Sequence, residues 1–123
     1  MTATRHAWFE VVTYFDGLSM RHPGFKPLTN LVEQIAASKF SEALHPWAAT
    51  HDLCLAQRAA QGTGESPYLR LRLISDAAIE FRYVDTAVES RQWCRVEPAD
   101  LAFGRLLIFF DQLNWFGPDS ERR

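Results

Sequence analysis

The residues best suited to bind a metal lie between positions 45 and 54. His45, His51 and Cys54 are all types that bind zinc. A zinc site needs four ligands, or three and an open position, and it usually contains a close pair such as C-x2-C. The sequence offers only the mixed pair His51-x2-Cys54, and these side chains would point to opposite faces of a regular strand. We therefore expect no bound metal.

The same segment has the composition of a nucleophilic triad. A triad is defined by side-chain geometry, and neighbours on a strand diverge, so Cys54, His51 and Asp52 do not predict one. No G-x-S-x-G motif occurs, and residues 62–64 lead into Pro67 and a strand rather than into a phosphate-binding helix. The sequence thus favours a protein that is not an enzyme and carries no cofactor.

Arginines mark a second candidate site. Eleven arginines stand against two lysines, and Arg70 and Arg72 alternate with leucines in the clearest pattern of the chain. Arginine and aromatic side chains on an open sheet can hold anionic ligands or single-stranded nucleic acid. Arg58, Tyr68, Asp52 and Glu80 are expected on the same side, so ordinary cross-strand ion pairs are the alternative. The candidate anion-binding residues are Arg70, Arg72, Arg82, Arg91 and Arg95.

A pocket between helices and sheet is a third candidate, because ligand sites are concave and lined mainly by apolar and aromatic residues. Its candidate lining is Trp47, His51, Tyr83 and Trp93. A core packed to normal density would leave no such cavity.

The elements that must position these residues begin with helices. Residues 7–18 have apolar side chains at helical spacing that also alternate as in a strand, and we predict a helix because the apolar positions continue past Gly17 to Leu18. Pro27 begins a second predicted helix, about residues 27–39. The stretch with Leu44 and Trp47 is expected to be irregular, because the residue before Pro46 avoids helical geometry.

From residue 50 the apolar period changes to two, which predicts strands. The alternating stretches are 53–55, 69–73, 79–83 and 91–96. Their connections are short, so an antiparallel meander is expected. The predicted fold is a single α+β domain over residues 1–123, in the order α-α-β-β-β-β-α, with helices on one face of a four-stranded sheet. A polar, disordered tail is expected from about residue 118.

The final predicted helix begins at Pro98 and is apolar almost all round. Such a helix needs cover on every side, whereas a two-layer domain covers one. Its aromatic residues are of the types that anchor interfaces, and symmetric homodimers are the commonest assembly. The candidate interface residues are Phe103, Leu106, Phe109, Phe110, Leu113, Trp115 and Phe116.

Composition narrows the class of protein. The chain has 123 residues, 47% of them hydrophobic, and a net charge of −2, which argues against nucleic-acid binding through bulk charge. Two cysteines make no disulfide framework, no signal-peptide pattern is present, and the longest apolar run, 106–110, is too short to cross a bilayer. A cytoplasmic location without membrane contact is expected.

These patterns support three hypotheses and name no biological process. The first is a non-catalytic protein that binds another protein, or a second copy of itself, through the aromatic terminal helix. The alternative is a nucleic-acid or anionic-ligand binder that uses the arginine-rich outer sheet face. The third is a small-molecule pocket between helices and sheet.

Overall fold

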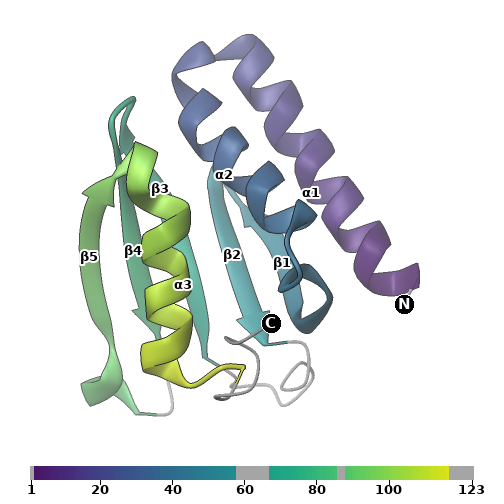
Figure 1. Cartoon of the computed structure of the whole chain (residues 1–123). Coiled ribbons are helices and arrows are strands. Elements are labelled where there is room, and N and C mark those ends of the chain that lie inside the picture. Colours follow the sequence, from purple (N-terminus) through teal and green to yellow (C-terminus); the bar gives the residue numbers. More distant parts are fainter. Residues whose placement is uncertain (1, 58–66, 86–87, 117–123) are drawn as a thin grey trace.

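Three helices lie against one face of an antiparallel sheet in the computed structural model of the chain (Figure 1). The structure describes residues 2–57, 67–85 and 88–116, with side chains from His6 onward. The α+β class, the antiparallel meander and the placement of the helices on one face are as predicted. The predicted tail from residue 118 lies outside the described residues.

The sheet has five strands rather than the four predicted. They follow one another in space in chain order, and each pairs antiparallel with the next. The strands are β1 (Leu44–Ala49), β2 (Asp52–Gln57), β3 (Tyr68–Ser75), β4 (Ala78–Val84) and β5 (Trp93–Pro98).

The additional strand is β1, in the stretch that was expected to be irregular. Proline restricts the preceding residue to extended backbone, which disfavours a helix but suits a strand. Pro46 also lies on an edge strand, which is where sheets tolerate proline. Thr50 has a positive φ of 58° in the short turn that pairs Ala49 with Asp52. This turn fixes the register between β1 and β2.

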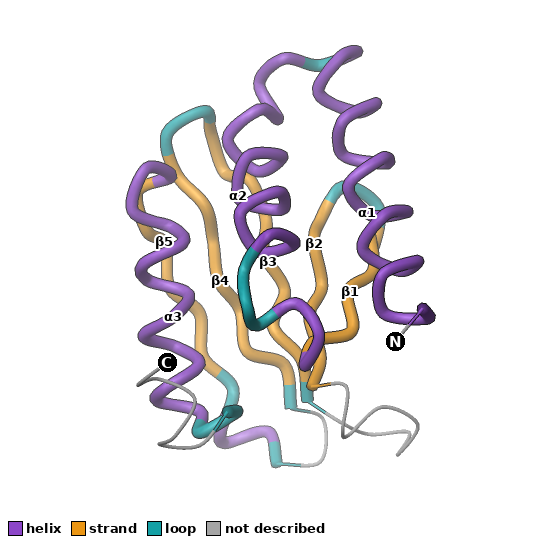
Figure 2. The backbone as a smooth tube through the Cα atoms, turned by 45° about the vertical axis from the view of Figure 1, so that its right-hand side comes forward, coloured by secondary structure: helices purple, strands orange, loops and turns teal. Residues whose placement is uncertain are grey.

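The predicted helix over residues 7–18 is confirmed as part of α1 (Thr2–Arg21), and the second helix as α2 (Lys26–Ala37). The terminal helix, α3 (Ala102–Leu113), is shorter than predicted. A 3-10 turn over Ala99–Leu101 precedes it, and Asn114, with a left-handed φ of 56°, ends it. In Figure 2, α1 lies over β1, and α3 lies over the β4–β5 side of the sheet. None of the described helices is both long and apolar enough to span a membrane.

The core fills the space between the helices and the sheet. The register aligns Leu53, Leu71 and Phe81 in one row across three strands, and all three are fully buried. Phe15 of α1 and Leu28 of α2 are also fully buried and belong to the same core. The alternation seen in the sequence thus correctly identified which residues of β3 and β4 face the helices.

Candidate functional site

Within the described part of the chain, no helix lies over the second face of the sheet (Figures 1 and 2). We call it the open face. The register defines it by the residues that alternate with those facing the helices: His45, Trp47, Asp52, Cys54, Ala56, Tyr68, Arg70, Arg72, Glu80, Arg82, Cys94 and Val96. The expected common side is confirmed for Asp52, Tyr68, Arg70, Arg72, Glu80 and Arg82. Arg58, which was expected with them, lies outside the described residues.

Two aromatic rings meet across β2 on the open face. Trp47 belongs to β1 and Tyr68 to β3, yet their ring centroids are 5.2 Å apart. They can meet because β2 places only the small residues Cys54 and Ala56 between them. The side chains above β2 leave Cys54 1% exposed and Ala56 5% exposed. The rings form an apolar platform that is itself only partly buried.

A buried carboxylate holds two arginines beside this platform. Oδ2 of Asp52 accepts hydrogen bonds from Nε of Arg70 at 2.7 Å and from Nε of Arg72 at 3.2 Å. The side chain of Asp52 is 8% exposed, whereas that of Arg72 is 51% exposed. The hydrogen bond to Asp52 raises the pKa of Arg70. One carboxylate oxygen therefore holds both guanidinium groups close together.

A third arginine, Arg82 of β4, lies beside Arg70 and Arg72 on the open face. Arg82 stands directly opposite Arg70 in the register, and its Nη2 lies 3.6 Å from Oε1 of Glu80. Like charges directly opposite on neighbouring strands destabilise a sheet. On the open face, three guanidinium groups thus face the two carboxylates of Asp52 and Glu80. We call Arg70, Arg72 and Arg82 the arginine cluster.

The two other predicted anion-binding residues do not join the cluster. Arg91 lies in the exposed 3-10 turn Glu89–Arg91. Arg95 pairs with Phe81 and so belongs to the helix-facing side, where its guanidinium lies 5.7 Å from the ring centroid of Trp93. The sequence placed Arg91 and Arg95 with the other arginines because of their alternating spacing. Which β5 residues lie on the open face depends instead on how the preceding turn joins β5 to β4.

The four predicted pocket residues are dispersed. Trp47 is on the open face, and His51 is exposed in the β1–β2 turn with its ring against Phe25. Tyr83 and Trp93 stack on the helix-facing side, with ring centroids 5.9 Å apart. The structure does not bring these four residues around one cavity, because consecutive strand residues face opposite sides and the turn directs His51 away.

The aromatic residues of the terminal segment are mostly inside the protein. Leu106, Phe109, Phe110 and Trp115 are buried, and Phe103, Leu113 and Phe116 are half-buried against the same core. Phe40, in the segment after α2, contacts Phe110 and Phe116 and so covers part of α3 and of the segment that follows it. Gln57 donates a hydrogen bond to the carbonyl of Trp115, which fixes the returning chain. These candidate interface residues are therefore already covered, fully or in part, by other residues of the same chain.

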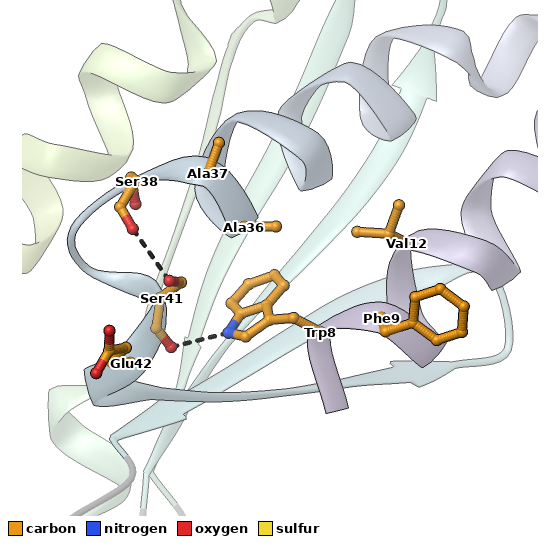
Figure 3. A pocket seen from close by; sticks show the side chains of 8 residues that line it. All are labelled: Trp8, Phe9, Val12, Ala36, Ala37, Ser38, Ser41 and Glu42. Carbon is orange, nitrogen blue, oxygen red and sulfur yellow. Dashed lines mark hydrogen bonds between the residues drawn. The ribbon is translucent and has the colours of Figure 1, made fainter. Parts of the chain in front are cut away.

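A shallow hollow lies between α1 and the end of α2 (Figure 3). It measures about 460 Å³ and is lined by Trp8, Phe9, Val12, Ala36, Ala37, Ser38, Ser41 and Glu42. Nε1 of Trp8 donates to the carbonyl of Ser41 at 2.8 Å, while Phe9 points away from Ala36 and Ser38 in the view. Glu42 is the one titratable side chain of the lining. The hollow thus lacks the paired groups that acid–base chemistry requires.

The thiols and the other metal-binding side chains show no reactive arrangement. Burial raises the pKa of Cys54 to about 11, so this thiol stays protonated at neutral pH. Burial also raises the pKa of Cys94. Over the described part of the chain, no three His, Cys, Asp or Glu side chains are grouped so that they could hold a metal.

Comparison with known proteins adds no assignment, since no family model, no curated protein and no solved structure matches the chain. The open face is therefore the candidate site on its own chemistry. Sequence reasoning placed Tyr68 and Asp52 on it but did not foresee that Asp52 would hold two arginines or that Trp47 would join Tyr68. The small residues Cys54 and Ala56, at alternate positions of β2, are the signal that could have shown the contact between Trp47 and Tyr68.

Proposed function

We propose that the protein acts by binding an acidic surface of another protein through its open face. The observation that carries the proposal is the arginine cluster beside the Trp47–Tyr68 platform, with two of its guanidinium groups held by one buried carboxylate. Tryptophan, tyrosine and arginine are the residue types that carry most of the binding energy at protein interfaces. A partner with carboxylates around an apolar centre complements both parts of this face.

The charge balance favours a protein over nucleic acid. Nucleic-acid binding depends on neutralising many phosphates, which requires a strongly basic surface. The whole chain has a net charge of −2, and the arginine cluster exceeds its two carboxylates by one charge. One excess charge suits a few carboxylates on a protein better than a phosphate backbone.

The proposal keeps protein binding as the function and moves the contact from α3 to the open face. The reason is that the strongest anchors on α3, such as Phe109 and Phe110, are already used by the core. A homodimer and a cytoplasmic location stay predictions of the sequence.

A displayed library of random peptides tests the proposal, because it selects ligands by affinity alone and needs no identified partner. Peptides are selected on the wild-type protein and then measured against the Arg72→Gln/Arg82→Gln double variant. The matched control is Arg21→Gln/Arg91→Gln, which removes the same charge from exposed positions off the open face. We expect selected peptides rich in Asp and Glu, with binding weakened at least about tenfold in the first variant and unchanged in the control.

Four outcomes would overturn the proposal. The first is the absence of enriched acidic peptides, and the second is equal binding of the selected peptides to both double variants. The third is tight, steeply salt-dependent binding of a single-stranded oligothymidine, which would make nucleic acid the ligand. The fourth is a stable dimer in light scattering that is lost in the Arg72→Gln/Arg82→Gln variant, which would make a second copy of the chain the occupant of this face.

A further inference from the structure

We infer that the arginine cluster is a preformed site for a single carboxylate group. The inference rests on the proposed function and deepens it, because it names the group of the partner that the cluster would bind. Three observations carry it: the hydrogen bonds of Asp52, the register between β3 and β4, and the charge that the cluster leaves uncompensated.

The hydrogen bonds of Asp52 use the Nε atoms of Arg70 and Arg72 and leave their Nη atoms available to a ligand. A guanidinium group carries one N–H at Nε and four at its two Nη atoms, and the Nη edge is suited to bidentate contact with a carboxylate. Asp52 is bonded to Arg70 and Arg72 through Nε alone. Because both Nε atoms donate to the same oxygen, the two guanidinium groups are neighbours, and the hydrogen bonds fix them before any ligand arrives.

The folding of the chain does not require this accumulation of charge. One guanidinium would neutralise Asp52, yet Arg72 supplies a second at 3.2 Å. Arg82 stands directly opposite Arg70, an arrangement that costs stability. Asp52 and Glu80 compensate two of the three guanidinium charges and leave one without a carboxylate. Residues that break a local rule of stability are expected at functional sites. A bound anion would supply the missing compensation.

The ligand class follows from charge and surroundings. The cluster and its two carboxylates leave one excess positive charge, which a monoanion neutralises and a phosphate dianion exceeds. The neighbouring Trp47–Tyr68 platform offers apolar contact to the chain that carries the carboxylate. An acidic side chain and a C-terminal carboxylate both supply this chemistry.

The test is a titration of the ¹⁵N-labelled protein with sodium acetate, at ionic strength held constant with sodium chloride. Side-chain Nε–Hε signals of the arginines report binding directly. We expect saturable shifts for Arg70 and Arg72 and none for Arg91. Affinity should fall at least about tenfold in Arg72→Gln. It should rise several-fold in Asp52→Asn, because removal of this carboxylate increases the local positive charge.

A second variant tests the same expectation without the loss of stability that Asp52→Asn causes. Glu80→Gln frees Arg82 from its carboxylate and should also tighten acetate binding. Shifts that are linear in acetate and equal in Arg72→Gln would overturn the inference, as would unchanged or weaker binding in both carboxylate variants. Tighter binding of methylphosphonate than of acetate at pH 8 would overturn the assigned ligand class.

Two further peptides separate the sources of the carboxylate. One is acidic and amidated at its C-terminus, and the other has no acidic side chain but a free C-terminus. Saturable, Arg72-dependent binding of either supports the site, and binding of neither overturns it. The inference and the proposed function can fail separately: acidic peptides that bind elsewhere on the open face while acetate does not bind would leave the function standing.

Discussion

The two faces of the sheet are formed by the same strands but differ in the side chains that they bring together. On the helix-facing side, Leu71 and Phe81 are fully buried and pair with each other, and Leu71 also pairs with the buried Leu53. On the open face, one residue along each strand, Arg70 and Arg82 are opposed like charges. The comparison shows that the first face is selected for volume and apolarity, whereas the second retains an arrangement that folding alone does not favour.

The largest expected effect comes from the helix-facing side. Phe81→Ala would open a cavity among Phe109, Leu71 and the other core residues, and it should lower the free energy of unfolding by about 3–5 kcal/mol. Urea denaturation measures this cost. A loss below about 1 kcal/mol would contradict the contrast between the faces, since it would mean that this side is not packed as a core.

The next effect concerns the one buried thiol of the open face, Cys54. Its pKa is raised by burial from 9.0 to about 11, so the folded state holds the proton more tightly than the unfolded state does. Stability from this group is complete below pH 9 and is lost as the pH rises toward 11, with a total of at most about 3 kcal/mol.

The control for this pH dependence is Cys54→Ala. Urea denaturation at several values between pH 8 and 11 should show a steeper decline for the wild type than for the variant, in which the other titrating groups still act. Parallel curves would mean that the rings of Trp47 and Tyr68 do not exclude water from the thiol.

A smaller loss of stability is expected when Asp52, the carboxylate that binds Arg70 and Arg72, is replaced. Asp52→Asn removes charge-assisted bonds to Arg70 and Arg72, but both partners are partly solvated, so the cost should be about 1–2 kcal/mol. Thermal and urea denaturation at neutral pH measure it. Arg72→Gln is the paired control, because Arg70 still neutralises Asp52 there. An equal loss in both variants would show that the second arginine is structural after all.

The smallest effect belongs to Arg82. Arg82→Gln breaks a long ion pair, in which Arg82 is half exposed, with Glu80 and also relieves the repulsion from Arg70, so the change in stability should stay within about 0.5 kcal/mol. The same urea series gives the value. A loss comparable to that of Phe81→Ala would erase the distinction between the two faces.

The sequence predicted best what depends on local periodicity. The alternation of Leu69, Leu71 and Leu73 follows directly from one buried and one open face, and the apolar spacing of residues 7–18 identified α1. Alternation alone therefore suffices to assign the residues of β3 and β4 to their two faces. Even Tyr68 and Asp52 were placed on the correct side.

What the sequence missed depends on contacts between distant segments. Strand β1 was missed because Pro46 suggested an irregular segment, whereas the segment is an edge strand that pairs with β2. The cover of α3 by Phe40 could not be read from either segment alone. The sharing of Asp52 by two arginines follows from the register between β2 and β3, which periodicity does not determine.

The order of the strands also bears on how the protein folds. Because each strand pairs with its chain neighbour, the hairpins β1–β2 and β3–β4 can form early, with little loss of chain entropy. The hydrogen bond from Gln57 to Trp115 instead joins residues 58 positions apart. We expect α3 to dock late and to detach first, so its amides should exchange with solvent sooner than those of β3. Such a transient opening would expose Phe109 and Phe110 without unfolding the meander, which makes this helix the first point of attack for proteases and of aggregation.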